Sequence, residues 1–129
     1  MKEFNNIKNF IFDLDGTLYG QELLEKVFGQ VSQRMGEFIS QELNVDLKKA
    51  KKLQINYFHR YNTSLNGLMV HHNINPKSFL SYVHRINLDF LKKDIVLREE
   101  LLKLDAKKYI YTNGSVEHIN QIITSLGID

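Results

Sequence analysis

The sequence predicts an α/β fold in which helices interrupt a small parallel sheet. Strand signals occur near the two ends of the chain: one apolar run begins at Phe10 and stops at Asp13, and another covers Tyr109–Tyr111. Three consecutive apolar residues after Asn9 are typical of a strand that is buried on both faces. Because parallel strands need a long crossover between them, the helical stretch in the middle fits this topology.

The middle of the chain is predicted to consist of consecutive helices. Apolar residues repeat every three or four positions from 22 to 43, which is helical spacing. Asp46 can cap a second helix that ends near Tyr61. The lysines of this second helix lie mostly opposite its apolar face; they are Lys48, Lys49, Lys51 and Lys52. A basic surface for an anionic partner is one interpretation, and a solvated helix face is the favoured one.

Four shorter helices are expected further along. Thr63 or Ser64 can cap the first of them, and Asn75-Pro76 places a cap before a proline at the start of the next. Residues 97–104 form another helical stretch. Ser115 can cap a last helix, which a glycine at position 127 would end.

Two aspartates follow the first predicted strand. Asp13 and Asp15 would lie at the carboxyl edge of the sheet, where open α/β folds bind their ligands. A carboxylate there can act as a nucleophile, and the edge can hold a hard divalent cation. Gly16 lets the chain turn after them, and Thr17 adds a hydroxyl. The alternative is a plain Asp-Gly turn between a strand and a loop.

The second predicted strand leads into Thr112-Asn113-Gly114-Ser115. Free backbone N–H groups and the helix dipole favour an anion at such a helix start, phosphate above all. The Thr112 hydroxyl can donate to a phosphoryl oxygen, and Gly114 permits close approach of the backbone. The same pattern also occurs in turns that bind nothing.

Together these segments resemble a known family. Apolar residues followed by Asp-x-Asp-Gly-Thr, at 10–18, resemble the first motif of the haloacid dehalogenase-like (HAD) hydrolases, and the strand that ends in Thr112 resembles the second. Residues 57–68, with 73–76 and 83–84, look like the cap of the pyrimidine 5′-nucleotidase branch. The pairing of Asp-Gly-Thr-Leu-Tyr at 15–19 with Tyr-Thr-Asn-Gly at 111–114 also resembles this branch.

The resemblance implies a Rossmann-like core with a helical cap inserted after the first strand. Residues 1–19 and 95–129 would form the amino-terminal part of the core, and residues 20–94 would form the cap. A cap inserted there would lie over the carboxyl edge of the sheet. Such lids exclude water from a reacting centre and carry substrate contacts.

The resemblance also implies a Mg²⁺-dependent phosphatase, a phosphoric monoester hydrolase. Asp13 would be the nucleophile that forms an aspartyl-phosphate, and Asp15 would be the general acid and base. Both aspartates would hold Mg²⁺, while Thr112, Asn113 and Gly114 would hold the phosphoryl oxygens. A pyrimidine nucleoside monophosphate is the expected substrate. The alternatives are another HAD phosphatase, for a sugar phosphate or phosphoglycolate, and a non-catalytic remnant that only binds.

The chain departs from the family after the second motif. A complete member continues with a lysine motif and an aspartate motif, whereas this sequence ends at Asp129. Lys103, Lys107 and Lys108 precede the second motif and cannot replace that lysine. We therefore expect a truncated form that is inactive and poorly folded by itself, because the sheet would expose an edge and apolar helix faces.

The composition of the chain gives no sign of a nucleic-acid-binding protein or of a protein that depends on cysteine. Seventeen basic and fifteen acidic residues in 129 leave a formal charge of +2, which gives no reason to expect nucleic acid as a partner. The absence of cysteine excludes disulfides and thiol chemistry. Neither a signal peptide nor an apolar run of roughly 20 residues is recognisable. The expectation is a cytoplasmic enzyme that acts on a small phosphate monoester without a membrane partner.

Overall fold

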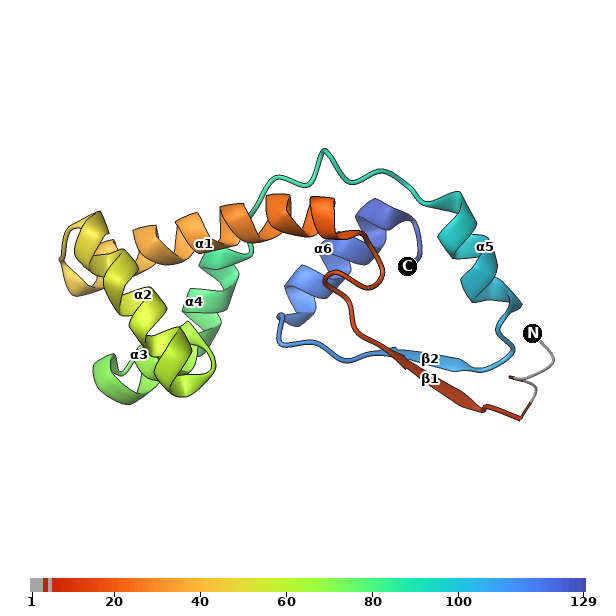
Figure 1. Cartoon of the computed structure of the whole chain (residues 1–129), viewed down its shortest axis with the longest axis horizontal. Coiled ribbons are helices and arrows are strands. Elements are labelled where there is room, and N and C mark those ends of the chain that lie inside the picture. Colours follow the sequence, from red (N-terminus) through yellow and green to blue (C-terminus); the bar gives the residue numbers. More distant parts are fainter. Residues whose placement is uncertain (1–3, 5) are drawn as a thin grey trace. The chain divides into compact units, whose positions relative to one another are not determined.

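The computed structural model describes residue 4 and residues 6–129. The chain divides into two compact units. We call residues 1–27 with 87–129 the sheet unit, and residues 28–86 the helical unit. The mixed α/β class is confirmed: most of the described chain is helical, and one small two-stranded sheet is present (Figure 1). The larger Rossmann-like core, and the assignment of a core and a cap, stay predictions.

The sheet unit contains a parallel pair of strands. β1 (Asn9–Phe12) pairs with β2 (Lys107–Ile110), with Phe12 opposite Ile110. This unit also holds the helices α5 (Ile95–Lys103) and α6 (Val116–Leu126), which precede and follow β2. Figure 1 shows the two strands side by side, although almost the whole chain separates them. The predicted parallel topology is thus confirmed at the level of one strand pair.

The prediction that the first strand is buried on both faces is wrong. Ile11 is 72% exposed, and its neighbour Tyr109 on the paired strand is 51% exposed. The two side chains share one face of the sheet, whereas Phe12 and Ile110 lie on the other, where residues of α5 and α6 approach them. A parallel strand becomes fully buried only when both faces are covered, and here one face is.

The helical unit follows the predicted order. It contains most of α1 and all of the next three helices, whose bounds are α1 (Gln21–Leu43), α2 (Leu47–Tyr61), α3 (Ser64–His72) and α4 (Pro76–Val83). Buried apolar side chains at helical spacing form its core; they include Val31, Ile39, Ala50, Leu68, Phe79 and Val83. Within the described residues, no helix is long and apolar enough to cross a membrane.

The predicted helix caps are confirmed where a side chain can accept from the helix's own first turn. Asp46 accepts from the backbone N–H of Lys49 at 2.7 Å, and Asn75 accepts from that of Ser78 at 3.1 Å. Of the two candidates before α3, Thr63 is the cap. These contacts satisfy donors that would otherwise lack a partner at a helix start.

The ends of the last two helices are also explained by local chemistry. Asp94 accepts from the N–H of Leu97 at 2.9 Å, so α5 begins two residues earlier than the apolar spacing predicts. Ser115 caps α6 by accepting from the N–H of His118 at 3.1 Å. Gly127 ends α6 with φ of +71°, a left-handed conformation that glycine adopts without strain.

Close packing joins α2 to α3. Gly67 lies so near Tyr57 that a Cβ atom at position 67 would be 2.5 Å from Cγ of that ring. The Tyr57 hydroxyl also lies 2.6 Å from Nε2 of His72. Burial raises the pKa of the Tyr57 hydroxyl above its ordinary value. The absence of a side chain at position 67 therefore allows the two helices to meet.

Gly67→Ala should destabilise the protein. Overpacking costs about 1–3 kcal/mol, and the base of the Tyr57 ring cannot move aside without shifting α2. This cost exceeds the gain of roughly 1 kcal/mol that alanine brings to a helix. Chemical denaturation should show a lower free energy of unfolding. Gly29→Ala in α1, where a Cβ meets nothing within 4 Å, is the control and should be neutral or stabilising. Equal effects from the two changes would contradict this packing.

Candidate active site

The strand pairing brings the two predicted motifs to one edge of the sheet. Asp13 follows the last residue of β1, and Thr112 comes shortly after the end of β2. The backbone N–H of Tyr111 donates to the carbonyl of Phe12 at 2.9 Å, which extends the pairing beyond the strands. The two motifs therefore meet at the carboxyl edge, where α/β sheets bind ligands.

Asp13 presents an exposed carboxylate at this edge. Its Oδ1 accepts from the backbone N–H of Leu14 at 2.9 Å, and its Oδ2 lies 3.4 Å from the Thr17 hydroxyl. The turn that follows is anchored by the fully buried Leu14 and passes through Gly16 at φ +78°. The side chain is thus held by its own turn while it remains accessible to a ligand.

Asp15 has a different environment. Its side chain is only 14% exposed, and its Oδ1 lies 3.0 Å from Nε2 of His118, a residue 103 positions away in the chain. The hydroxyl of Tyr19 donates to the same oxygen. Both partners are buried, and the His118 side chain is 2% exposed. One aspartate therefore faces solvent, while the other is held by buried side chains.

The environment of Tyr19 favours its neutral form. Burial, and then the hydrogen bond to Asp15, raise the pKa of the Tyr19 hydroxyl above its ordinary value. Asp13 adds to this effect through its charge. The hydroxyl therefore remains a donor to Asp15 over the whole neutral range.

The loop before α6 is tightly folded. The Thr112 hydroxyl oxygen accepts from the N–H of Gly114 at 3.1 Å, which leaves the hydroxyl hydrogen able to donate elsewhere. Gly114 packs against His118: a Cβ at position 114 would be 2.8 Å from Cδ2 of that ring. Asn113 is exposed. The structure thus gathers the predicted phosphate-binding residues at the start of α6, and their binding of phosphate stays a prediction.

Sequence reasoning missed Tyr19 and His118. Tyr19 could have been noticed because it lies four residues after Asp15, across a glycine turn. His118 offers a weaker signal, since a lone histidine in the first turn of a helix is common. Only the strand pairing reveals that this turn lies beside the aspartates.

The fit of the site to Mg²⁺ depends on the two aspartates. Among residues 4 and 6–129, no group of three or more acidic, histidine or cysteine side chains could hold a metal ion. Mg²⁺ is commonly bound through one or two carboxylates, with water and phosphate oxygens as its other ligands. The exposed carboxylate of Asp13 suits that arrangement. Among the described residues the site thus offers Mg²⁺ an accessible carboxylate, and binding of the ion stays a prediction.

The lysines near β2 are engaged elsewhere. Lys108 Nζ donates to the carbonyls of Leu104 and Ala106 at 2.7 and 3.1 Å, and Lys103 pairs with Glu100 at 2.5 Å. The Lys108 contacts hold the link between α5 and β2, and the Lys103 contact lies within α5. They agree with the inference that these lysines do not serve the phosphate site.

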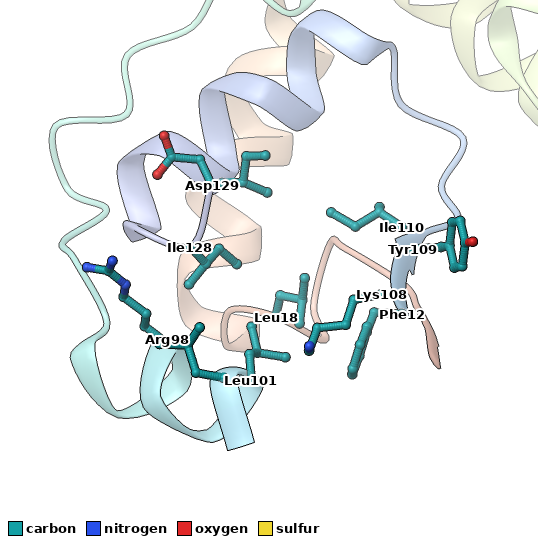
Figure 2. Close-up of a pocket in the computed structure, with 11 residues that line it drawn as sticks. Phe12, Leu18, Arg98, Leu101, Lys108, Tyr109, Ile110, Ile128 and Asp129 are labelled. Carbon is teal, nitrogen blue, oxygen red and sulfur yellow. The ribbon is translucent and has the colours of Figure 1, made fainter. Parts of the chain in front are cut away.

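A separate hollow of about 330 Å³ lies in the sheet unit (Figure 2). Its lining is mainly apolar and includes Phe12, Leu18 and Ile110, with Arg98 and Lys108 among the polar residues. None of the predicted site residues lines it. The hollow is therefore distinct from the edge that carries the aspartates.

The chain is similar to a curated protein, phosphate metabolism protein 8 of Saccharomyces cerevisiae. The two are 32% identical over 133 residues, an alignment that covers 94% of this chain and 40% of that protein. The chain thus spans 40% of the length of this relative. No protein-family model matches the chain.

The raised pKa of Tyr19 predicts a loss of stability in alkali. A pKa that is higher in the folded state stabilises the protein fully below the ordinary tyrosine pKa of about 10, and this stabilisation is lost as the pH rises above it. The free energy of unfolding should therefore fall more steeply above about pH 10 in the wild type than in Tyr19→Phe. Tyr111→Phe removes a hydroxyl from a side chain that is 78% exposed and should leave the wild-type slope unchanged. Parallel slopes for the wild type and Tyr19→Phe would contradict the prediction.

Proposed function

We propose that this chain belongs to a Mg²⁺-dependent phosphatase of the HAD type. The observation that carries the proposal is the meeting of Asp13 and Thr112 at one edge of a parallel strand pair, beside the start of α6. The name of the related yeast protein, which refers to phosphate metabolism, agrees with it. Because the chain spans only 40% of that relative, the activity of the whole protein is part of the proposal.

Asp13 would act as the nucleophile. Its exposed carboxylate attacks phosphorus, the bond from phosphorus to the leaving oxygen breaks, and an aspartyl-phosphate forms. Water then attacks this intermediate and releases inorganic phosphate. The Thr112 hydroxyl and the start of α6 would hold the phosphoryl oxygens, because the helix dipole favours negative charge there.

Asp15 would transfer the protons. Its carboxyl group protonates the leaving oxygen in the first step, and its carboxylate then takes a proton from the attacking water in the second. The half-buried setting of Asp15, with Tyr19 and His118 on one oxygen, supports this role because it keeps the group in one orientation. The Asp13 carboxylate is exposed instead, and exposure suits a group that must reach the phosphorus atom.

The Asp13 carboxylate and the backbone carbonyl of Asp15 would also hold Mg²⁺. When bound, the ion offsets negative charge on the phosphoryl oxygens. A pyrimidine nucleoside 5′-monophosphate is the proposed substrate, on the resemblance of the helical unit to a nucleotidase cap. Assays of the full-length protein should therefore compare uridine and cytidine monophosphates with a sugar phosphate and phosphoglycolate.

Asp13→Asn should abolish phosphate release by the full-length protein without unfolding it. An amide cannot attack phosphorus, and it binds Mg²⁺ less well. Phosphate assays with circular dichroism would measure both properties. Asp105→Asn, at another exposed aspartate of the sheet unit, is the matched control and should retain full activity. Activity of Asp13→Asn within about tenfold of wild type, a barrier change of only roughly 1.4 kcal/mol, would refute the assignment.

Asp15→Asn should slow both chemical steps. General acid–base catalysis typically contributes about 10²-fold or more, so formation and breakdown of the aspartyl-phosphate should each fall by at least that factor. Rapid-quench, single-turnover experiments can follow the two steps separately. If neither step slows, another residue must transfer the proton.

A further inference from the structure

Two donors from opposite ends of the chain converge on one oxygen of Asp15. The Tyr19 hydroxyl reaches Oδ1 across the Gly16 turn, and Nε2 of His118 reaches it from α6 at 3.0 Å. Both donors are buried, and a buried polar group is costly unless it is hydrogen-bonded. Breaking either contact would leave a buried donor to find another partner, so the arrangement is expected to persist.

The protein holds both donors in place. The ring of His118 packs against Gly114, and its backbone N–H is capped by Ser115 at 3.1 Å. Tyr19 lies beside the buried Leu18 at the end of the turn that begins at Asp13. Neither ring can move far without disturbing the turn or the start of α6. The two contacts therefore fix the orientation of the Asp15 carboxylate.

We propose that Tyr19 and His118 are positioning residues, which we call the Asp15 clamp. They hold Oδ1 of Asp15 so that Oδ2 of the same carboxyl group carries the proton. This inference rests on the proposed function. The Oδ2 proton passes to the leaving oxygen as the bond to phosphorus breaks, and Oδ2 then receives a proton from the attacking water. Because His118 lies in the first turn of α6, the clamp also ties the acid–base group to the helix start that would hold phosphate.

The clamp should affect turnover rather than substrate binding. Both of its side chains are buried, which leaves them little surface with which to contact a substrate. A carboxylate that can rotate spends less time in the geometry needed for proton transfer. Small misplacements of this kind lower the reaction rate by up to about 10²-fold. Loss of a donor should therefore lower kcat while KM changes little.

The test compares variants of the full-length protein. His118→Leu should lower kcat about 10- to 100-fold, whereas His118→Gln retains an N–H donor and should recover most of this loss. Tyr19→Phe keeps the ring, removes only the hydroxyl, and should also lower kcat. Lys108→Met is the control, because it breaks contacts of 2.7 and 3.1 Å to the carbonyls of Leu104 and Ala106, away from the aspartates and the cap. It should lower stability and leave kcat unchanged.

Nuclear magnetic resonance provides a readout that does not depend on activity. The imidazole nitrogen signals of His118 should shift in Asp15→Asn and stay unchanged in Asp105→Asn. Signals unaffected by Asp15→Asn would overturn the contact itself. A folded His118→Gln no faster than His118→Leu would overturn the role as a hydrogen-bond donor.

Activity outcomes separate the clamp from the proposed function. Wild-type activity that Asp13→Asn abolishes, with kcat unchanged in both His118→Leu and Tyr19→Phe, would refute the clamp and leave the phosphatase standing. A wild-type protein inactive on every phosphate monoester tested would refute the phosphatase, and the catalytic role of the clamp with it.

Discussion

The parallel pairing of β1 with β2 is the constraint that creates the candidate site. Parallel strands place their carboxyl ends at the same edge, so the residues that follow each strand must meet there. The pairing continues through the hydrogen bond from Tyr111 to Phe12, which brings the Thr112 loop beside Asp13. It also sets α6 next to the turn after β1. His118 can then reach Asp15 from 103 positions away.

The different surroundings of the two aspartates follow from the turn that begins at Asp13 and passes through Gly16. The turn leaves Asp13 at the exposed edge and directs Asp15 inward, toward Tyr19 and His118. Carboxylates that perform different steps need different environments, because the nucleophile must reach its target whereas a proton donor must keep one orientation. The turn from Asp13 to Tyr19, with Gly16 at φ +78°, and His118 from α6 together provide these environments.

Features determined by neighbouring residues could be predicted, and those determined by distant contacts could not. The caps Asp46 and Asn75 were predictable because a cap contacts the first turn of its own helix. The burial of Ile11 was mispredicted, since apolar sequence shows that a strand could be covered but not what covers it. His118 gives only a weak signal for the same reason: its partner, Asp15, lies at the other end of the chain.

One donor of the loop that would bind phosphate already has a partner within the loop, which bears on how an anion could enter. The N–H of Gly114 donates to the Thr112 hydroxyl oxygen, so the hydroxyl can donate its hydrogen to a phosphoryl oxygen without losing that bond. An approaching phosphate could also replace the Thr112 hydroxyl as the acceptor of the Gly114 N–H. The N–H would then donate to a charged phosphoryl oxygen instead of a neutral hydroxyl. Hydrogen bonds to charged groups are stronger than those between neutral groups. The bond between Gly114 and Thr112 would therefore help the loop to stay folded without a ligand while still allowing it to favour an anion.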